Sequence, residues 1–427
     1  MIKNKNINSV LNEILVKIEP PKKEMNEMKS CIKEFIREFG KNISKLKISA
    51  EIFIGGSFAK NTVIKKDCYD ADIFVRFDKK YKDDEISKIT FKALKNIKNV
   101  SVIHGSRDYF RVMINPFFSL EIIPVIKVKN PKEARNITDL SYSHVRYIKR
   151  KIKSKKSLGD IKIAKAFCYA RKCYGAESYI RGFSGYAIEL LVYYYGGFLK
   201  FVKAMSVAKE KIVIDIEKDF KNKQNVLMDL NSAKLQSPII LIDPTFKNRN
   251  ALAALSKETF EKFKRECQRF LKNPSITSFE VKKTDLNKIK KYSSRKGFEF
   301  ILMEAETDKQ EGDIAGSKLL KFYKHLEKEI EKFFDIKNCG FDYKGGHSAG
   351  YFFAVKTKKE ILFKGPGLKD EKNVKRFKKE HRNTFVKSGR IYATEKIKFS
   401  ILEFIESWRK KNKNRMKEMS VNELRII

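Results

Sequence analysis

The sequence predicts an α+β protein, in which a mixed sheet with helices is followed by a helical region and then by a second region of strands and helices. Three observations support this fold class. Short segments rich in β-branched and aromatic residues come first, helical periodicity replaces them after Ser141, and strands return beside a long helix after Pro274. A chain of 427 residues with 42% hydrophobic content can bury a substantial core. We therefore expect three domains, at residues 1–140, 141–272 and 273–427.

The first region begins with an amphipathic helix. Apolar residues recur at helical spacing over Lys23–Gly40, which predicts a helix lying against the sheet that follows. A second helical interval covers Ile86–Ile97. Short β-branched segments predict strands at Ile52–Ile54, Ala71–Phe77, Ser101–His104, Tyr109–Ile114 and Ser119–Val128.

Helices dominate the second region. Helical periodicity predicts them at His144–Lys153, Leu158–Tyr174, Tyr186–Met205 and Ala251–Leu271. The segment Leu241–Asn250 contains Pro and Asn, so we expect a turn that leads into the last of these helices. In the third region we expect a long helix at Ile314–Phe334 and strands at Phe298–Glu304, Tyr351–Thr357 and Glu360–Lys364.

The charge of the chain favours a polyanionic partner. Lys and Arg number 93 against 52 Asp and Glu, which gives a formal net charge of +41. Solubility needs far less, so nucleic acid is the leading candidate. The alternative is that an AT-rich genome inflates the number of lysine codons, since Lys, Ile and Asn are all abundant. Charge alone therefore does not decide the partner.

The cysteines and apolar stretches indicate an intracellular, cytoplasmic protein. The six cysteines form no C-x-x-C pair, so neither a zinc site nor a disulfide framework is expected. The N-terminal segment lacks the apolar core of a signal peptide. The most apolar stretch, Ala187–Leu199, contains Glu189 and two glycines and is too short to span a bilayer.

Two acids occupy one predicted strand. Alternation along a strand sends Asp70 and Asp72 to the same face, a few ångströms apart. Two like charges so close need a cation, and their hard oxygen atoms suit Mg²⁺, which also binds substrate phosphates. Glu121 stands among apolar neighbours in a later strand; because a buried carboxylate without a partner is costly, it is predicted to be the third ligand. The alternative is that Asp-x-Asp lies on a solvated strand face.

A glycine-serine turn precedes these acids. Glycine lets the backbone of Gly55-Gly56 approach a phosphate, and Ser57 offers a hydroxyl and exposed N–H groups at the start of a helix. Lys60 adds a positive charge one turn later. Together with the three acids, this turn predicts a nucleotidyltransferase palm that binds a nucleoside triphosphate with its metal.

Lys165 lies on the same helical face as Ile161, Ala164 and Cys168, so its ammonium falls in a stripe that should be buried. It either reaches a triphosphate at the edge of a cleft or extends to solvent. His144 stands near the start of a predicted helix that is rich in basic residues. It either binds a ligand there or is a surface residue.

Two longer motifs add a resemblance to a family. Tyr174-Gly175-Ala176-Glu177 and the segment from Arg181 to Tyr186 resemble the YGAE and RGFSGY signatures of the archaeal, class I CCA-adding enzymes, the tRNA nucleotidyltransferases. Further segments follow in the order of that family, over nearly the whole chain: GGSFAKNT, Asp70 and Asp72, Lys165, Asp243-Pro244, Arg249-Asn250, Gly365-Pro366 and Ser388-Gly389-Arg390.

The resemblance implies Mg²⁺-dependent, template-independent addition of C, C and A to the 3′ end of tRNA, from CTP and ATP, with release of pyrophosphate. It implies that Asp70, Asp72 and Glu121 are catalytic and hold Mg²⁺. The residues that it assigns to nucleotide binding are Gly56, Ser57, Lys60, Ser141, His144, Lys165, Tyr174 and Arg249. The guanidinium of Arg249 can donate to acceptors on both cytosine and adenine; a structural salt bridge is the alternative.

Three positions depart from the family pattern. Lys60 stands where arginine is usual, which keeps the charge and loses the bidentate fork. Glu121 replaces an expected aspartate, and Ser141 retains a hydroxyl near where threonine is typical. We expect these changes to affect rate and nucleotide preference rather than the class of reaction.

Basic clusters in the last third of the chain are expected to neutralise RNA phosphates. They comprise Lys282, Lys283, Lys288, Lys290, Lys291, Arg295 and Lys296, and then Lys375, Arg376, Lys378, Lys379 and Arg382. Recognition of folded RNA by shape and backbone is expected, and the resemblance suggests the acceptor stem and TΨC arm of tRNA. The sequence leaves open whether the protein forms a homodimer. The alternative functions are an adenylate-only or oligoadenylate-forming enzyme and an inactive RNA-binding homologue.

Overall fold

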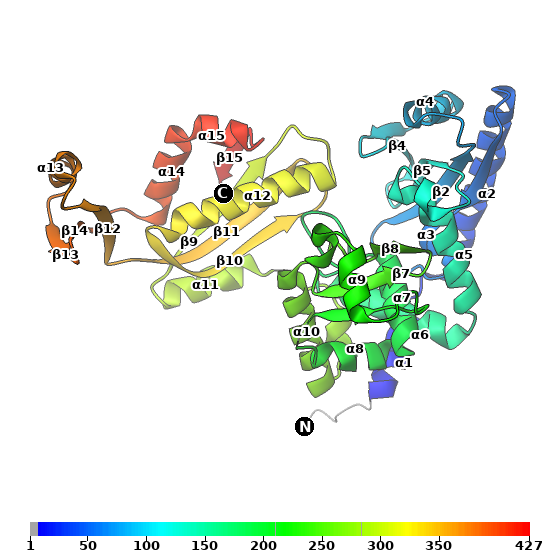
Figure 1. The fold of residues 1–427 in the computed structure, drawn as a ribbon, viewed down its shortest axis with the longest axis horizontal. Coiled ribbons are helices and arrows are strands. Elements are labelled where there is room, and N and C mark those ends of the chain that lie inside the picture. Colours follow the sequence, from blue (N-terminus) through cyan, green and yellow to red (C-terminus); the bar gives the residue numbers. More distant parts are fainter. Residues whose placement is uncertain (1–6, 210, 283) are drawn as a thin grey trace. The chain divides into compact units, whose positions relative to one another are not determined.

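The computed structural model describes residues 7–209, 211–282 and 284–427. The chain divides into two compact units, Met1–Lys282 and Lys283–Ile427 (Figure 1). One lysine of the predicted basic clusters, Lys283, lies outside the described residues. Among the residues that are described, no helix is both long and apolar enough to cross a membrane.

A five-stranded sheet in the order β1-β2-β5-β4-β3 forms the first part of unit 1. Only β2 and β5 pair in parallel among the pairs of this sheet. The helices α2 and α4 pack together on one face of the sheet, where they bury a shared core (Figure 1). The elements are α1 (Ile7–Ile18), α2 (Lys22–Lys45), β1 (Ala50–Ile54), α3 (Gly56–Lys60), β2 (Tyr69–Phe77), α4 (Asp83–Leu94), β3 (Val100–Ile103), β4 (Tyr109–Asn115), β5 (Phe118–Ile126), η1 (Pro131–Glu133) and η2 (Ile137–Leu140).

The apolar stripe of α2 explains how the sheet is oriented. Met28, Ile32 and Phe39 share a core with alternate residues of β2, from Ala71 to Phe77. Because successive side chains of a strand point to opposite faces, Asp70 and Asp72 lie on the face away from α2. The predicted helix Lys23–Gly40 is present and runs five residues further, to Lys45.

Helices and a small sheet complete unit 1. A core of aliphatic and aromatic residues joins α1, α6, α7, α8 and α10, and the sheet has the order β6-β7-β8. The elements are α5 (Ser141–Lys151), α6 (Lys155–Ala170), α7 (Gly185–Tyr195), α8 (Phe198–Ser206), β6 (Ile212–Ile214), α9 (Lys223–Asp229), η3 (Ser232–Leu235), β7 (Ile239–Asp243), β8 (Phe246–Asn250), α10 (Lys257–Lys272) and η4 (Ile276–Phe279).

Two predictions for this part were wrong. The helix expected at Tyr186–Met205 is two helices, because Gly196 and Gly197 adopt φ of 73° and 126° and end the first one. The turn expected at Leu241–Asn250 belongs to a hairpin, β7–β8, whose strands pair around Pro244. The next helix therefore begins only at Lys257, with Ser256 as its N-cap.

Unit 2 contains an antiparallel four-stranded sheet, in the order β10-β11-β9-β15, and a three-stranded sheet, β12-β14-β13. The helix expected to reach Phe334 ends at Glu331, and Phe334 begins a strand. The elements are α11 (Leu286–Arg295), β9 (Glu299–Glu306), α12 (Asp313–Glu331), β10 (Phe334–Tyr343), β11 (Ser348–Thr357), β12 (Glu360–Gly367), α13 (Glu371–Glu380), β13 (Thr384–Lys387), β14 (Arg390–Lys396), α14 (Ile401–Lys411), α15 (Lys413–Glu418) and β15 (Glu423–Ile426).

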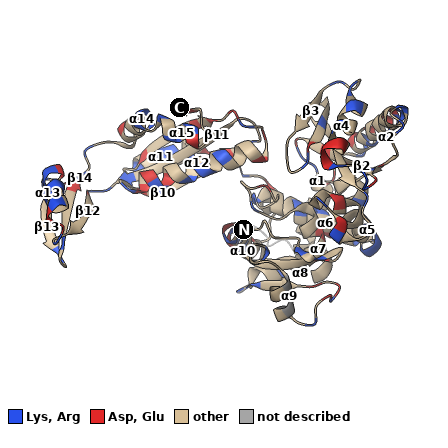
Figure 2. Cartoon of the chain, turned by 45° about the horizontal axis from the view of Figure 1, so that its top comes forward, with Lys and Arg blue, Asp and Glu red and all other residues tan. Residues whose placement is uncertain are grey.

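Most residues of the basic clusters lie on two short helices of unit 2, α11 and α13. Half of the residues of α13 are Lys or Arg, and Figure 2 shows the colour of those residues on this helix, with red from its glutamates. Most of the other cluster lies on α11.

Candidate active site

The three predicted acids meet on one face of the first sheet. The parallel pairing of β2 with β5 sets Asp72 beside Glu121, and Asp70 beside Ser119. Neighbouring strands lie about 4.8 Å apart, so this register fixes Asp72 and Glu121 side by side. Asp70 follows on the same face of β2, two residues earlier.

The electrostatics of the acids agree with this geometry. Burial raises the pKa of Asp72 to about 7, and the charges of Asp70 and Glu121 add to the effect, which Lys60 partly offsets. Burial also raises the pKa of Glu121, and Asp70 raises it further, although Arg111 donates to Glu121 Oε1 over 3.2 Å. The repulsion among the acids is relieved when a cation binds.

The donor set fits a divalent cation, because carboxylate oxygens are the hard ligands that Mg²⁺ prefers. Within residues 7–209, 211–282 and 284–427, however, no three His, Cys, Asp or Glu side chains are already grouped at the spacing of a metal site. Asp70 is half exposed, and Lys66 Nζ lies 4.0 Å from its Oδ1. The acids thus form an open face rather than a closed cage.

The glycine-serine turn packs directly against Asp72. The N–H of Gly55 donates to the carbonyl oxygen of Asp72 over 2.8 Å. Gly56 has φ of +54°, and a Cβ at this position would lie 1.7 Å from Asp72 Oδ2. Only glycine fits there. Ser57 follows Gly56 in the first turn of α3.

A buried glutamate joins the two predicted phosphate-binding lysines. Glu189 on α7 accepts from Lys60 Nζ at Oε2 and from Lys165 Nζ at Oε1, each over 2.7 Å. Thr62 Oγ1 accepts from Lys165 over 2.7 Å and lies 3.1 Å from Glu189 Oε1. Lys165 is therefore neither extended to solvent nor unpaired: it is 2% exposed.

The charges of this cluster depend on one another. Burial lowers the pKa of Lys165 to about 8, against the opposing effect of Glu189. Burial disfavours ionisation of Glu189 as well, but Lys165 and Lys60 more than compensate and hold its pKa below the usual value. A second anionic group, such as a phosphate, would balance the positive charge left over by two lysines and one glutamate.

Tyr174 links this cluster to the acids. A Cβ on Gly185 would lie 2.9 Å from the Tyr174 hydroxyl and 3.8 Å from Lys165 Cε, so these residues meet at the start of α7. Burial raises the pKa of Tyr174, and the charges of Glu189, Asp70 and Asp72 contribute. The phenol therefore stays protonated and can donate.

His144 and Arg249 meet at a second buried acid. Asp243 is fully buried and accepts from Arg249 Nη1 over 2.7 Å and from the Tyr186 hydroxyl over 3.0 Å. His144 Nε2 lies 3.0 Å from Asp243 Oδ2, and its ring stacks on Tyr186 with centroids 4.1 Å apart. Burial lowers the pKa of His144, so the imidazole is neutral at pH 7.

The two clusters are neighbours. Lys60 Nζ lies 6.0 Å from the centroid of the Tyr186 ring, which stacks on His144. Ser141, the first residue of α5, precedes His144 by one turn. The predicted nucleotide-binding residues are thus brought to one region of unit 1, and Arg249 is 22% exposed there while paired with Asp243.

Four residues that organise this region were not predicted: Lys66, Thr62, Tyr186 and Glu189. Of these, Glu189 had a signal in the sequence, because it is a lone acid in the most apolar helical stretch. Such an acid must find cationic partners when it is buried. Lys66 had no such signal, since the sequence around it is generally polar and basic.

Comparisons with known proteins agree on the family. A model of the nucleotidyltransferase domain matches residues 32–158, and a model of the second domain of tRNA nucleotidyltransferases matches residues 159–280. The chain resembles the fold of the Cid1 poly(U) polymerase crystallised with Mg and 3′-dATP: the TM-score is 0.50 with 13% identity, over 66% of this chain and 100% of that chain.

Curated relatives are similar over most of their length. A CCA-adding enzyme of Nanoarchaeum equitans is 33% identical over 356 residues, which cover 83% of this chain and 86% of the relative. A CCA-adding enzyme of Methanocaldococcus jannaschii is 28% identical, over 92% of this chain and 88% of the relative. The chain therefore belongs to the family of archaeal CCA-adding enzymes, the tRNA nucleotidyltransferases.

Proposed function

We propose that this enzyme adds C, C and A in turn to the 3′ end of tRNA, without a nucleic-acid template, using CTP and ATP. The observation that carries the proposal is the pairing of Asp72 with Glu121 on neighbouring strands. Asp70 lies on the same face of the sheet, and the glycine-serine turn packs against Asp72. The relatives named as CCA-adding enzymes support the choice of substrate.

In this proposal Asp70, Asp72 and Glu121 hold Mg²⁺. Bound there, Mg²⁺ lowers the pKa of the attacking hydroxyl and neutralises charge on the triphosphate. The tRNA 3′ hydroxyl gives its proton to solvent as its oxygen forms a bond to the α-phosphorus of the nucleotide. The bond from that phosphorus to the oxygen that bridges to the β-phosphate breaks, which releases pyrophosphate.

The protein groups position the nucleotide. Gly56 and Ser57 offer backbone N–H groups and a hydroxyl to the phosphates. Lys60 and Lys165 keep their ammonium groups together through Glu189, so both can donate to one triphosphate.

The remaining assigned residues act on the sugar and base. Tyr174 and Ser141 supply hydroxyl groups, and His144 supplies a neutral imidazole held by Asp243. The same carboxylate orients Arg249, so a structural salt bridge and base contact are compatible roles for this guanidinium.

We assign residues 1–140 to the palm, 141–272 to the central domain and 273–427 to a C-terminal RNA-binding region. The basic helices α11 and α13 support this last assignment, with the acceptor stem and TΨC arm of tRNA as their target. The enzyme would work in the cytoplasm, as a monomer or a homodimer.

The test is incubation of the protein with tRNA that lacks its CCA end, Mg²⁺ and each nucleotide separately. CTP is expected to be incorporated first and ATP only after CTP. Incorporation of ATP alone would replace the proposal by an adenylate-only enzyme. No incorporation of either nucleotide would leave an RNA-binding homologue.

A further inference from the structure

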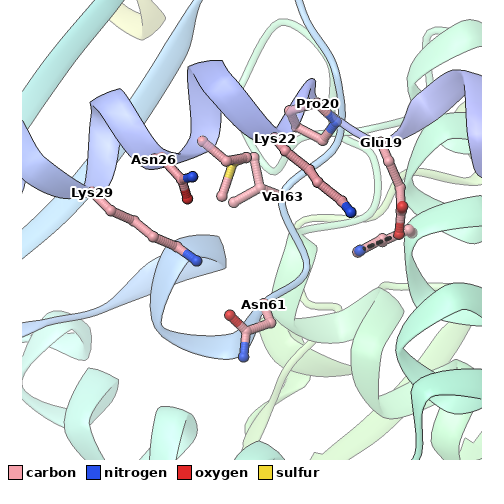
Figure 3. Close-up of a pocket in the computed structure, with 9 residues that line it drawn as sticks. Glu19, Pro20, Lys22, Asn26, Lys29, Asn61 and Val63 are labelled. Carbon is pink, nitrogen blue, oxygen red and sulfur yellow. Dashed lines mark hydrogen bonds and ion pairs between the residues drawn. The ribbon is translucent and has the colours of Figure 1, made fainter.

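A groove lies between the first half of α2 and the turn that follows α3 (Figure 3). Its volume is about 290 Å³. This is the lower limit for pockets that enclose a small molecule, so the groove suits phosphate groups better than a whole nucleoside triphosphate. Three lysines, Lys22, Lys29 and Lys162, and two amides, Asn26 and Asn61, line it.

The groove keeps an uncompensated positive charge. Glu19, the one acid among its described lining residues, is bound to Lys162 over 2.7 Å. Neither Lys22 nor Lys29 forms an ion pair or hydrogen bond within the described part of the chain. Figure 3 shows both side chains extending from α2 toward the turn that carries Asn61. An anion would find two ammonium groups and neutral amides there.

The charges of α2 are arranged so that its lysines, and not its acids, line the groove. Lys22 and Lys29 are seven residues apart, so they lie on one stripe of the helix, about 10.5 Å apart along its axis. The acids of the same helix lie on another stripe, beyond the buried face: Glu24, Glu27, Glu34 and Glu38. The lysines therefore face the groove without nearby acids of their own helix.

The groove lies beside the turn that joins α3 to β2. Asn61, which lines the groove, stands between Lys60 and Thr62, and both of these residues contact Glu189. An anion in the groove would therefore lie next to the segment that carries Lys60.

We propose that this groove binds phosphate groups of the tRNA backbone. The inference rests on the proposed function for the identity of the RNA. The two lysines at an interval of about 10.5 Å contact separate phosphates, while the asparagine amides donate to their oxygens. The binding is electrostatic and independent of base sequence.

The test compares two double variants of the full chain. Lys22→Gln/Lys29→Gln removes the charges that line the groove. Lys23→Gln/Lys41→Gln removes two exposed charges from the same helix, on a different stripe. The probe is tRNA lacking its CCA end, and its Kd is measured at several salt concentrations. A third variant, Lys22→Arg/Lys29→Arg, keeps both charges.

The groove variant is expected to raise the Kd roughly threefold to tenfold and to reduce the slope of log K against log salt by about 2, one for each lost phosphate contact. The arginine variant should stay within about twofold of the unchanged protein, and the control pair should leave the slope unaltered. Equal effects of the two glutamine pairs would overturn the proposal.

The KM for CTP and ATP separates two sources of phosphate. If the groove binds RNA, these KM values stay unchanged in the groove variant at saturating tRNA. A rise in the KM for nucleotide with an unchanged Kd for tRNA would show a triphosphate or pyrophosphate site instead, and would overturn the inference. If the unchanged protein does not incorporate CTP, the proposed function is refuted. The groove is still tested in that case, because the Kd measurements need no catalysis.

Discussion

Lys165 on α6 donates to Glu189 on α7 over 2.7 Å, with both side chains almost fully buried. Glu189 is also the partner of Lys60, which stands 129 residues earlier in the chain. One carboxylate thus connects the palm to the central helices and fixes the distance between two cations. The cluster joins these segments through buried ion pairs.

Replacing Glu189 by Gln is expected to destabilise the protein by about 3–5 kcal/mol, because two buried ammonium groups lose their counter-charge. Urea unfolding followed by circular dichroism measures this. The matched control is Glu51→Gln. The Glu51 carboxylate is half exposed and pairs with the half-exposed Lys127 and the buried Arg76; the amide oxygen can still accept from Arg76, so the loss should be smaller, about 1–2 kcal/mol. Similar losses in both variants would argue against a central role for the cluster.

The stability difference between the unchanged protein and Glu189→Gln should depend on pH. The pKa of Glu189 is held below 4.5 in the folded state, so its carboxylate contributes stability that is present above pH 4.5. This contribution is lost as pH falls through the folded-state pKa. Loss of Glu189 also lowers the pKa of Lys165 further, so the difference in urea midpoints should not shrink between pH 7 and 5, and it should narrow below pH 4.5. A difference that stays constant through this acid range would contradict the assignment.

Gly56→Ala is expected to reduce nucleotide transfer by about 100-fold or more, because the new Cβ would collide with Asp72 Oδ2 and displace it. Gly297→Ala is the matched control. It has a similar φ of +67° with no atom within 4 Å of the new Cβ, so it carries the backbone strain of about 1–2 kcal/mol without the collision. Steady-state rates of CTP incorporation compare the two. Equal activity in both variants would show that the turn tolerates a side chain beside Asp72.

Asp243→Asn should lower the thermal midpoint and raise the KM for nucleotide together. The buried carboxylate accepts from Arg249, Tyr186 and the N–H of Thr245, and an amide satisfies fewer of these donors. A stability loss of about 2–4 kcal/mol is expected. Tyr186→Phe removes one of these bonds and should cost about 1 kcal/mol. An unchanged KM in Asp243→Asn would mean that Arg249 and His144 do not contact the nucleotide.

The sequence carried enough information for the fold class and for the face on which the acids lie. The predicted α+β fold with a nucleotidyltransferase palm is confirmed. Alternation along β2 is a local property, so the shared face of Asp70 and Asp72 follows from their spacing. The roles of these residues stay predictions.

Contacts between distant segments could not be predicted. The pairing of Glu189 with Lys60 joins elements that have no local pattern in common. The meeting of Glu121 with Asp72 was predicted from the cost of burying a lone carboxylate, but the register of the two strands that produces it is not a local property. The hairpin at Pro244 was missed because its strands are short and its turn residues dominated the pattern. The break between α7 and α8 was missed because the helical periodicity of apolar residues continues through Gly196 and Gly197.

The most direct measurement is Mg²⁺-dependent incorporation of CTP into tRNA that lacks its CCA end, by the unchanged protein and by Asp72→Asn. Asp78→Asn, an exposed acid just beyond the far end of β2, serves as the control. We predict loss of about 100-fold or more in Asp72→Asn, with unchanged affinity for tRNA, and full activity in the control. Equal rates of incorporation in Asp72→Asn and the unchanged protein would contradict a catalytic centre built on these acids.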